Sequence, residues 1–523
     1  MTMSFRQTFW VVLVISLSEC FSSLVKIPIL NMPSKPAQSV SIFPEILSTQ
    51  NTETSGNLRM ITVLYTNDEH GWMGGVDGLG AANLMAVWQD DYNYSLDNGH
   101  LILSGGDMWS GAAISTWFEG ASMVQTMNAM GYRAAALGNH EFDFGLDKLA
   151  QRVNEMAFPL LSANIRYKSS GEIPTDLGIQ AFTVLEVSGV SVGIIGLTTT
   201  STPESTLPDV VAPFDFIDHE VALREVVPQV REAGADMIMV LSHACPLDVF
   251  SLAHRVADLD INFIGGGHCH NLYSVKWGEM VILSGGSDLQ SFAYVEFLYD
   301  VQADKVTITE HGVAYNRPQT PIAELSDLID IWHSKADTTL GEVIGYTEKT
   351  IPQHSRLMNE LVLEPWLLSF PHADVALSNT GGIRADIKAG EITVGDIITV
   401  LPFDNRIIEL ELTGEELSSI LVDKRNKLIV AGLTKFAGKW FVTETGEQLN
   451  PEQHYSVLIN SFIYTGGDGY NFSKYTLTAF DTTVLYHEPL LDWLRAQGTN
   501  ESMPINEIVE TLRTPTYFDL LSW

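Results

Sequence analysis

The sequence is short of cysteine and of positive charge. Its 523 residues include three cysteines, so a small disulfide-held scaffold is excluded and stability has to come from hydrophobic cores. Its 29 Lys and Arg residues stand against 64 Asp and Glu residues, which gives a formal net charge of −35. This acidity argues against a nucleic-acid polymer as partner, because phosphate neutralisation needs clustered basic residues. Small phosphorylated ligands remain compatible with it, since a bound metal ion can supply positive charge locally.

Long hydrophobic runs are also missing. The apolar run Phe9–Leu17, with Arg6 before it, has the length of a signal-peptide core and is too short to span a bilayer. We therefore expect a signal peptide over residues 1–20 and an extracytoplasmic protein (periplasmic, secreted or at the cell surface) of bacterial type. We prefer the interpretation that the signal peptide is removed without lipidation. The alternative is a lipid anchor at Cys20, but Glu19 stands where a lipoprotein motif has a small residue. Residues 21–57 are expected to form an irregular leader.

The rest of the chain has the composition of a folded protein. Its hydrophobic fraction is 45%, and its length predicts two to four domains. From Met60 onward, short apolar runs alternate with amphipathic stretches, which indicates an α/β architecture of packed layers. Proline residues and a helical spacing predict a linker helix within 318–340. We therefore expect one domain over 58–317 and a smaller mixed α/β domain over 341–515.

Five strand-like runs each lead into a loop that carries Asp, Asn or His. The runs and their polar residues are 60–65 with Asp68 and His70, 100–103 with Asp107, 134–137 with Asn139 and His140, 237–241 with His243, and 261–264 with His268 and His270. Ligands bind at the carboxyl ends of strands in layered α/β folds. Each motif alone is more typical of a polar loop or a helix cap, but their joint occurrence indicates one shared site.

The nitrogen and oxygen atoms of these side chains suit divalent ions such as Zn, Mn or Co. Seven donors exceed what one tetrahedral ion uses, so two ions that share a carboxylate are expected. Such pairs clamp phosphoryl oxygens and activate an attacking water. His140 is adjacent to Asn139 and is free to face a substrate. Asp143 could orient its imidazole and keep it protonated, which would let His140 stabilise the transition state or protonate a leaving group.

These motifs resemble the metallophosphoesterase signature in its 5′-nucleotidase branch. The matching segments are Thr66-Asn-Asp-Glu-His-Gly71, Gly106-Asp107, Gly138-Asn-His-Glu-Phe-Asp143, Ser242-His243 and Gly267-His-Cys-His270. The resemblance implies a two-sheet β-sandwich flanked by helices. It also implies the site roles: Asp68, His70 and His270 on one ion, Asn139, His243 and His268 on the other, Asp107 bridging them, and His140 with Asp143 as the catalytic pair.

The resemblance continues in the C-terminal part. The segments Asn379-Thr-Gly-Gly-Ile-Arg384, Leu401-Pro-Phe403, Asn460-Ser-Phe462 and Gly466-Gly-Asp468 resemble the substrate-binding motifs of the family. They imply that Phe403 and Phe462 sandwich a base, that Asp468 accepts hydrogen bonds from ribose, and that Asn379 and Arg384 hold the base and phosphate regions. Arg356 is expected to bind phosphate as well, because arginine grips phosphate through a planar fork. The segment around it is shorter than in the family.

The sequence therefore predicts an exported two-metal phosphohydrolase that converts nucleoside 5′-monophosphates to nucleoside and phosphate. Small-molecule nucleotides would be its partners, and movement at the linker helix would bring substrate to metal. The alternatives at the same site are a 2′,3′-cyclic nucleotide phosphodiesterase with 3′-nucleotidase activity and a nucleotide-sugar pyrophosphatase. A non-enzymatic alternative is a secreted nucleotide-binding protein. The sequence sets neither the preferred base nor the oligomeric state.

The cysteines Cys245 and Cys269 lie next to proposed metal donors. They could form a disulfide that braces the metal site, which would agree with an oxidising compartment. The alternatives are a pair of buried thiols, or a thiol that competes for zinc.

Overall fold

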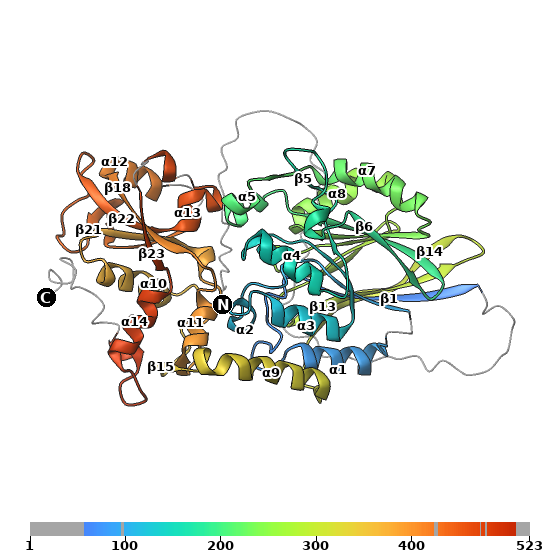
Figure 1. The fold of residues 1–523 in the computed structure, drawn as a ribbon, viewed down its shortest axis with the longest axis horizontal. Coiled ribbons are helices and arrows are strands. Elements are labelled where there is room, and N and C mark those ends of the chain that lie inside the picture. The colour runs from blue at the N-terminus through green and yellow to red at the C-terminus, as the bar shows by residue number, and fades with distance from the viewer. Residues whose placement is uncertain (1–56, 96–98, 423–426, 471, 476–478, 509–523) are drawn as a thin grey trace, which may run out of the picture. The chain divides into compact units, whose positions relative to one another are not determined.

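The computed structural model describes residues 57–95, 99–422, 427–470, 472–475 and 479–508 (Figure 1). The predicted signal peptide over 1–20, with Cys20, and the leader up to residue 56 lie outside these residues. Within the described part of the chain, no helix has both the length and the apolar character needed to cross a membrane.

Two six-stranded sheets form the N-terminal part of the described chain (Figure 1). The first has the order β14-β13-β1-β2-β3-β4, and the second has the order β11-β12-β10-β9-β7-β6. The strands of the first sheet are β1 (Leu58–Thr66), β2 (His100–Ser104), β3 (Tyr132–Ala136), β4 (Leu160–Leu161), β13 (Ser291–Asp300) and β14 (Lys305–Tyr315). Those of the second are β6 (Phe182–Val187), β7 (Val190–Thr198), β9 (Met237–His243), β10 (Phe263–Gly265), β11 (Leu272–Trp277) and β12 (Met280–Gly285).

The two sheets pack face to face. Val63 and Leu101 of the first sheet and Met239 and Phe263 of the second belong to one fully buried cluster. Helices cover the outer face of each sheet: α1 (Ala81–Tyr92), α3 (Ala121–Met130), α4 (Leu146–Glu155) and α9 (Ala323–Leu340) on the first, and α7 (His219–Glu232) and α8 (Pro246–Arg255) on the second. The two-sheet sandwich flanked by helices is therefore confirmed.

Parallel pairing explains why the polar loops meet. In the first sheet β1 pairs in parallel with β2, and β2 with β3. In the second, β9 and β10 pair in parallel, between parallel neighbours β7 and β12. The five runs that precede the predicted donors are thus β1, β2, β3, β9 and β10. Their carboxyl ends lie along one edge of the sandwich. The remaining short elements of this part are α2 (Ala113–Thr116), β5 (Ile165–Tyr167), α5 (Thr202–Ser205), α6 (Pro208–Val211) and β8 (Phe214–Phe216).

The C-terminal part has a five-stranded sheet with the order β19-β16-β22-β18-β23. Its strands are β16 (Val375–Asn379), β18 (Arg406–Thr413), β19 (Leu428–Ala431), β22 (His454–Asn460) and β23 (Phe480–Leu485). The helices α10 (Arg356–Ser369), α11 (Val394–Val400) and α14 (Glu488–Gln497) bury one face of it, and α12 (Gly414–Leu421) and α13 (Ser461–Thr465) bury the other. Smaller elements are β15 (Val343–Thr347) with β17 (Gly390–Thr393), β20 (Leu433–Phe436) with β21 (Lys439–Val442), and α15 (Ile505–Ile508).

Helix α9 lies within the segment where a linker helix was predicted. Its apolar side chains recur at helical spacing, so they form one stripe. Leu325, Ile329 and Trp332 pack into the cluster on the outer face of the first sheet. Ala336 and Leu340 pack into the cluster of the C-terminal sheet. The helix is therefore part of two hydrophobic cores at once, and the described residues all belong to one compact unit.

Candidate active site

The first group of metal-donor side chains contains Asp68, His70 and His270, whose donor atoms lie within 4.8 Å of one another. Nδ1 of His70 is 2.8 Å from the carbonyl oxygen of Ser110, which fixes that nitrogen as the N–H donor. Nε2 of His70 then carries the lone pair and faces Nε2 of His270 at 3.1 Å. Burial and the Arg384 guanidinium lower the pKa of His70 well below its usual value and that of His270 to about 4, so both rings are neutral donors.

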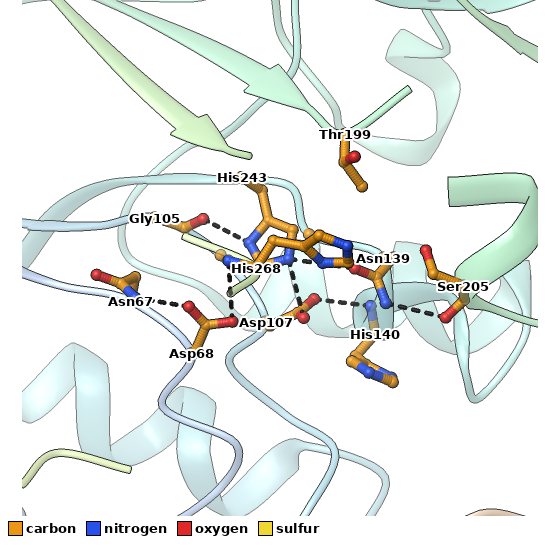
Figure 2. A network of polar contacts seen from close by, with 12 residues as sticks. Asn67, Asp68, Gly105, Asp107, Asn139, His140, Thr199, Ser205, His243 and His268 are labelled. Atoms are coloured by element: carbon orange, nitrogen blue, oxygen red, sulfur yellow. Dashed lines mark hydrogen bonds and ion pairs between the residues drawn. The ribbon is translucent and has the colours of Figure 1, made fainter. Parts of the chain in front are cut away.

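The second group contains Asp107, His243 and His268. Nδ1 of His243 donates to the carbonyl oxygen of Gly105 at 2.8 Å, and Nε2 faces Oδ2 of Asp107 at 2.9 Å (Figure 2). Oδ1 of Asn139 lies 3.2 Å from the same Nε2, because the amide nitrogen of Asn139 is turned outward to the Ser205 carbonyl. Nitrogen and oxygen donors from five loops thus converge on two neighbouring positions.

Divalent cations fit these positions. The outward hydrogen bonds of His70, His243 and Asn139 leave acceptor atoms aimed inward, which is the arrangement found around bound metals. Burial acts to lower the pKa of His243, but the Asp107 carboxylate outweighs it and raises the pKa to about 10. The space between Asp107 and His243 therefore favours a positive charge. A bound divalent cation would supply that charge in place of the proton on His243. The structure puts Asp107 in the second group, and its sharing between two ions remains a prediction.

The backbone of the donor loops is held in an uncommon conformation. Five donor residues have positive φ angles: Asp68 at 51°, His70 at 46°, Asp107 at 59°, His268 at 66° and His270 at 54°. Non-glycine residues pay a conformational cost for this left-handed region, and such residues cluster at functional sites. The surrounding structure must therefore impose it.

Glu141 is one source of that constraint. Its buried carboxylate accepts hydrogen bonds from the backbone N–H groups of Asp107, Met108 and Gly138 at 3.0, 2.7 and 2.7 Å. A side chain at Gly138 would collide with the Asp107 carboxylate, so glycine is required at this close approach. Glu141 was not singled out from the sequence, although it lies inside the motif Gly138–Asp143.

His140 and Asp143 form a hydrogen-bonded pair beside the second group. Nδ1 of His140 lies 2.7 Å from Oδ2 of Asp143, whose other oxygen accepts from the Thr206 hydroxyl at 3.0 Å. The backbone N–H of His140 donates to Oδ1 of Asp107 at 2.8 Å. Burial opposes the charged ring, but Asp143 and Asp107 outweigh it and raise the pKa of His140 above its usual value. These two carboxylates therefore favour the protonated form of the imidazole.

Side chains of the C-terminal part line the same cavity of about 220 Å³ as Asp107, Asn139, His140, His268 and His270. Nη2 of Arg384 lies 3.2 Å from Nε2 of His70, within reach of an anion held at the first group. The Phe403 ring stacks on the His140 imidazole, with centroids 5.4 Å apart and planes inclined by 13°. Phe462 lines the cavity as well.

A polar chain of side chains forms another part of the wall. Asn379 donates to Oδ2 of Asp468 at 2.9 Å and accepts from Asn460 at 2.8 Å. Nζ of Lys427 is 2.7 Å from Oδ1 of Asp468, so this cavity carboxylate is paired with a cation. Lys427 was missed in the sequence, because it belongs to none of the matching motifs and its place depends on the sheet order β19-β16-β22.

Arg356 is the predicted site residue that the structure does not bring to the cavity. It is the first residue of α10, where Ser355 caps the helix through a hydrogen bond to the Met358 N–H. Its side chain is 78% exposed, and its guanidinium pairs with Glu360 one helical turn later at 2.6 Å. The helix start thus turns the side chain toward solvent. Gln353 and His354, just before the cap, instead line a second cavity together with His70, His270 and Arg384.

Cys245 and Cys269 are joined by a disulfide, with their Cα atoms 5.1 Å apart. Of the three alternatives considered for these cysteines, the structure therefore shows the first, a disulfide next to the metal donors. Cys245 is half-buried and Cys269 is exposed, so the alternative of two buried thiols does not describe them.

Comparisons with known proteins agree with this geometry. A profile of the 5′-nucleotidase C-terminal domain matches residues 358–475. The 5′-nucleotidase of Vibrio parahaemolyticus is 26% identical over 526 residues, which cover 86% of this chain and 92% of that protein. The trifunctional nucleotide phosphoesterase protein YfkN of Bacillus subtilis is 25% identical over 88% of this chain, but the chain spans only 36% of the length of YfkN. The crystal structure of the 5′-nucleotidase precursor of Thermus thermophilus superposes with a TM-score of 0.73 at 25% identity, covering 84% of this chain and 97% of that one.

The sandwich, the two donor groups and the C-terminal sheet define the class: a two-part metallophosphoesterase, which is a metal-dependent hydrolase. Within that class, several of the matches in sequence and structure are 5′-nucleotidases. The chain resembles these proteins over most of its length, at 26% and 25% identity to the two named above, and in its C-terminal part through the matching domain profile.

Proposed function

We propose that the protein is an exported two-metal phosphohydrolase that cleaves nucleoside 5′-monophosphates to nucleoside and phosphate. The observation that carries the proposal is the single cavity that combines donors of both metal groups with Phe403, Phe462 and the Asn379–Asp468 pair. Stacking on aromatic rings suits a flat base, and the paired amide and carboxylate suit hydroxyl groups. Export rests on the signal peptide predicted over residues 1–20.

The residues of the chain take distinct parts in this reaction. Divalent cations held by the two donor groups would polarise the phosphoryl group and lower the pKa of the attacking water. Arg384 binds a phosphate oxygen, since its guanidinium lies beside the first group. His140, oriented and kept charged by Asp143, donates its proton to the leaving oxygen of the nucleoside. Asp107 is the carboxylate that we assign to both ions.

Phosphate release from AMP, ADP, ATP, UDP-glucose and 2′,3′-cyclic AMP tests the proposal, with chelator-treated and metal-restored enzyme compared side by side. Fast, metal-dependent release from AMP is the expected result. Turnover of only the cyclic nucleotide or the diphosphates would leave the metal site in place and overturn the substrate assignment. No turnover of any of them, with two ions bound, would favour the nucleotide-binding protein.

The second cavity favours nucleotide sugars as a further substrate class. It has a volume of about 230 Å³ and is lined by His70, His270, Arg384, Gln353 and His354 among others. A monophosphate ends at the phosphorus atom that is attacked, whereas a nucleotide sugar carries a further group beyond it. A cavity that shares His270 and Arg384 with the first one could hold that group. We expect His354→Trp to reduce turnover of UDP-glucose relative to AMP; an unchanged ratio would reject this second substrate.

The two aromatic side chains are expected to differ in their effects. Base stacking is worth about 1–3 kcal/mol, so Phe462→Ala should raise KM for AMP by about 5- to 150-fold. Turnover of p-nitrophenyl phosphate, which has no base, should not change. Phe403→Ala should raise KM likewise and in addition lower kcat for both substrates, because its ring supports His140. Steady-state kinetics of both variants on both substrates checks this, and unchanged KM values for AMP would contradict the stacking role.

A further inference from the structure

The Cys245–Cys269 disulfide connects the two loops that supply the histidine donors of the second sheet. Cys245 lies two residues after His243, at the start of α8, and Cys269 lies between His268 and His270. His268 belongs to the group with Asp107 and His243, whereas His270 belongs to the group with Asp68 and His70. One covalent bond therefore restrains a loop that contributes a donor to each group.

In the described part of the chain, His268 and His270 lack the hydrogen bond from the second ring nitrogen that orients His70 and His243. Rings that bind metals commonly donate their second N–H to a protein oxygen, which fixes their orientation. His70 and His243 do so through the carbonyl oxygens of Ser110 and Gly105. Among the described residues, neither the His268 ring nor Nδ1 of His270 has such an oxygen partner. The loop is also exposed at Cys269 and at His270, whose side chain is 38% exposed.

Backbone hydrogen bonds from other strands and turns hold the two ends of the loop, at Gly266 and Asn271, and few such contacts hold the stretch between them. The N–H of Gly267 donates to the Ala244 carbonyl at 3.1 Å, and that of His268 donates to Oδ1 of Asp68 at 3.1 Å. His268 and His270 both have positive φ angles, so the loop needs restraint to keep its rings pointed at the donor groups. The disulfide supplies that restraint at the residue between them.

We propose that the Cys245–Cys269 disulfide is a positioning element for both metal groups, and that opening it weakens metal binding. The proposal rests on the two-metal site of the proposed function. Opening requires a reductant of the phosphine or dithiol class. The phosphine attacks the disulfide and the S–S bond breaks. One water molecule then gives its oxygen to phosphorus, which forms the phosphine oxide, and its two protons to the sulfur atoms, so that Cys245 and Cys269 become thiols. The half-buried to exposed position of the cysteines makes the bond accessible to such reagents.

The test is the affinity of the metal-stripped protein for Mn²⁺, measured by calorimetric titration, in the wild type and in the double variant Cys245→Ala/Cys269→Ala. Removing both thiols prevents a free cysteine from acting as a new ligand. Loss of support around a metal-binding histidine typically costs 10- to 100-fold in affinity, so we expect a weakening of about that size. At saturating Mn²⁺, kcat should return toward the wild-type value, because all donors are still present.

Two controls separate positioning from general stability. Leu252→Ala removes a buried side chain from α8, the helix that begins directly after Cys245, and is expected to lower the melting temperature but not the Mn²⁺ affinity. Treatment of the wild-type protein with a phosphine should weaken Mn²⁺ binding as the double variant does, and reoxidation should restore it. Equal Mn²⁺ affinity in the oxidised, reduced and double-variant proteins would overturn the proposal. Because Mn²⁺ binding is measured without substrate, this outcome is distinct from a failure of the nucleotidase assignment.

Discussion

Asp107→Asn is expected to remove at least one bound ion per chain and to lower kcat/KM for AMP by about 10³-fold or more. The Asp107 side chain is buried, with Oδ2 2.9 Å from His243 Nε2 and Oδ1 accepting from the His140 N–H. Asparagine keeps the shape but loses the negative charge that attracts a cation to this position. Metal assistance contributes several kcal/mol to charge stabilisation in the transition state, and each 1.4 kcal/mol is tenfold in rate.

Metal analysis of the dialysed protein, together with steady-state kinetics, measures both effects. Asp404→Asn is the matched control, because Asp404 lines the same cavity without belonging to either donor group. It should keep two ions per chain. An Asp107→Asn protein with two ions and nearly normal turnover would remove Asp107 from the metal site.

His140→Ala should lower kcat for AMP by about 10²- to 10⁴-fold, the usual contribution of a positioned proton donor, without changing metal content. The loss should be smaller for p-nitrophenyl phosphate, whose leaving group needs no proton. Equal losses on both substrates would show that His140 is not the proton donor.

The pH dependence gives a second measurement of the same role. Asp143 and Asp107 raise the pKa of His140, so the charged ring persists above pH 6.5 and is lost as the pH rises through the higher value. In the wild type, kcat for AMP should fall on the alkaline side for this reason. That alkaline limb should be absent from the His140→Ala profile.

The donor residues could be predicted from the sequence because their signal is local. An apolar run that ends in Asp, Asn or His marks a strand and its carboxyl end, and parallel pairing brings such ends together. Which donors share an ion could not be read in this way. Asp68 and His270 meet across 202 positions of chain, and their contact depends on two sheets that pack face to face. Only the resemblance to the 5′-nucleotidases implied which donors share an ion.

Arg356 and Lys427 show that the motifs of the C-terminal part do not determine which side chains line the cavity. The direction of the Arg356 side chain is set by where the helix begins, at the Ser355 cap, and by its ion pair with Glu360. Lys427 reaches the cavity because β19 is a neighbour of β16, the strand that carries Asn379. Neither the exact start of α10 nor the pairing of β19 with β16 can be recognised from a sequence motif.

Each donor group takes side chains from both sheets of the sandwich: Asp68 and His70 with His270, and Asp107 with His243 and His268. An ion in either position would thus fasten the two sheets together at the edge where their strands end. Unfolding would have to release it, so the free energy of unfolding should grow with ion concentration, by about 4 kcal/mol at a thousand times Kd. The ions that serve the reaction would then also stabilise the fold, and the sandwich would unfold more readily where metal ions are scarce.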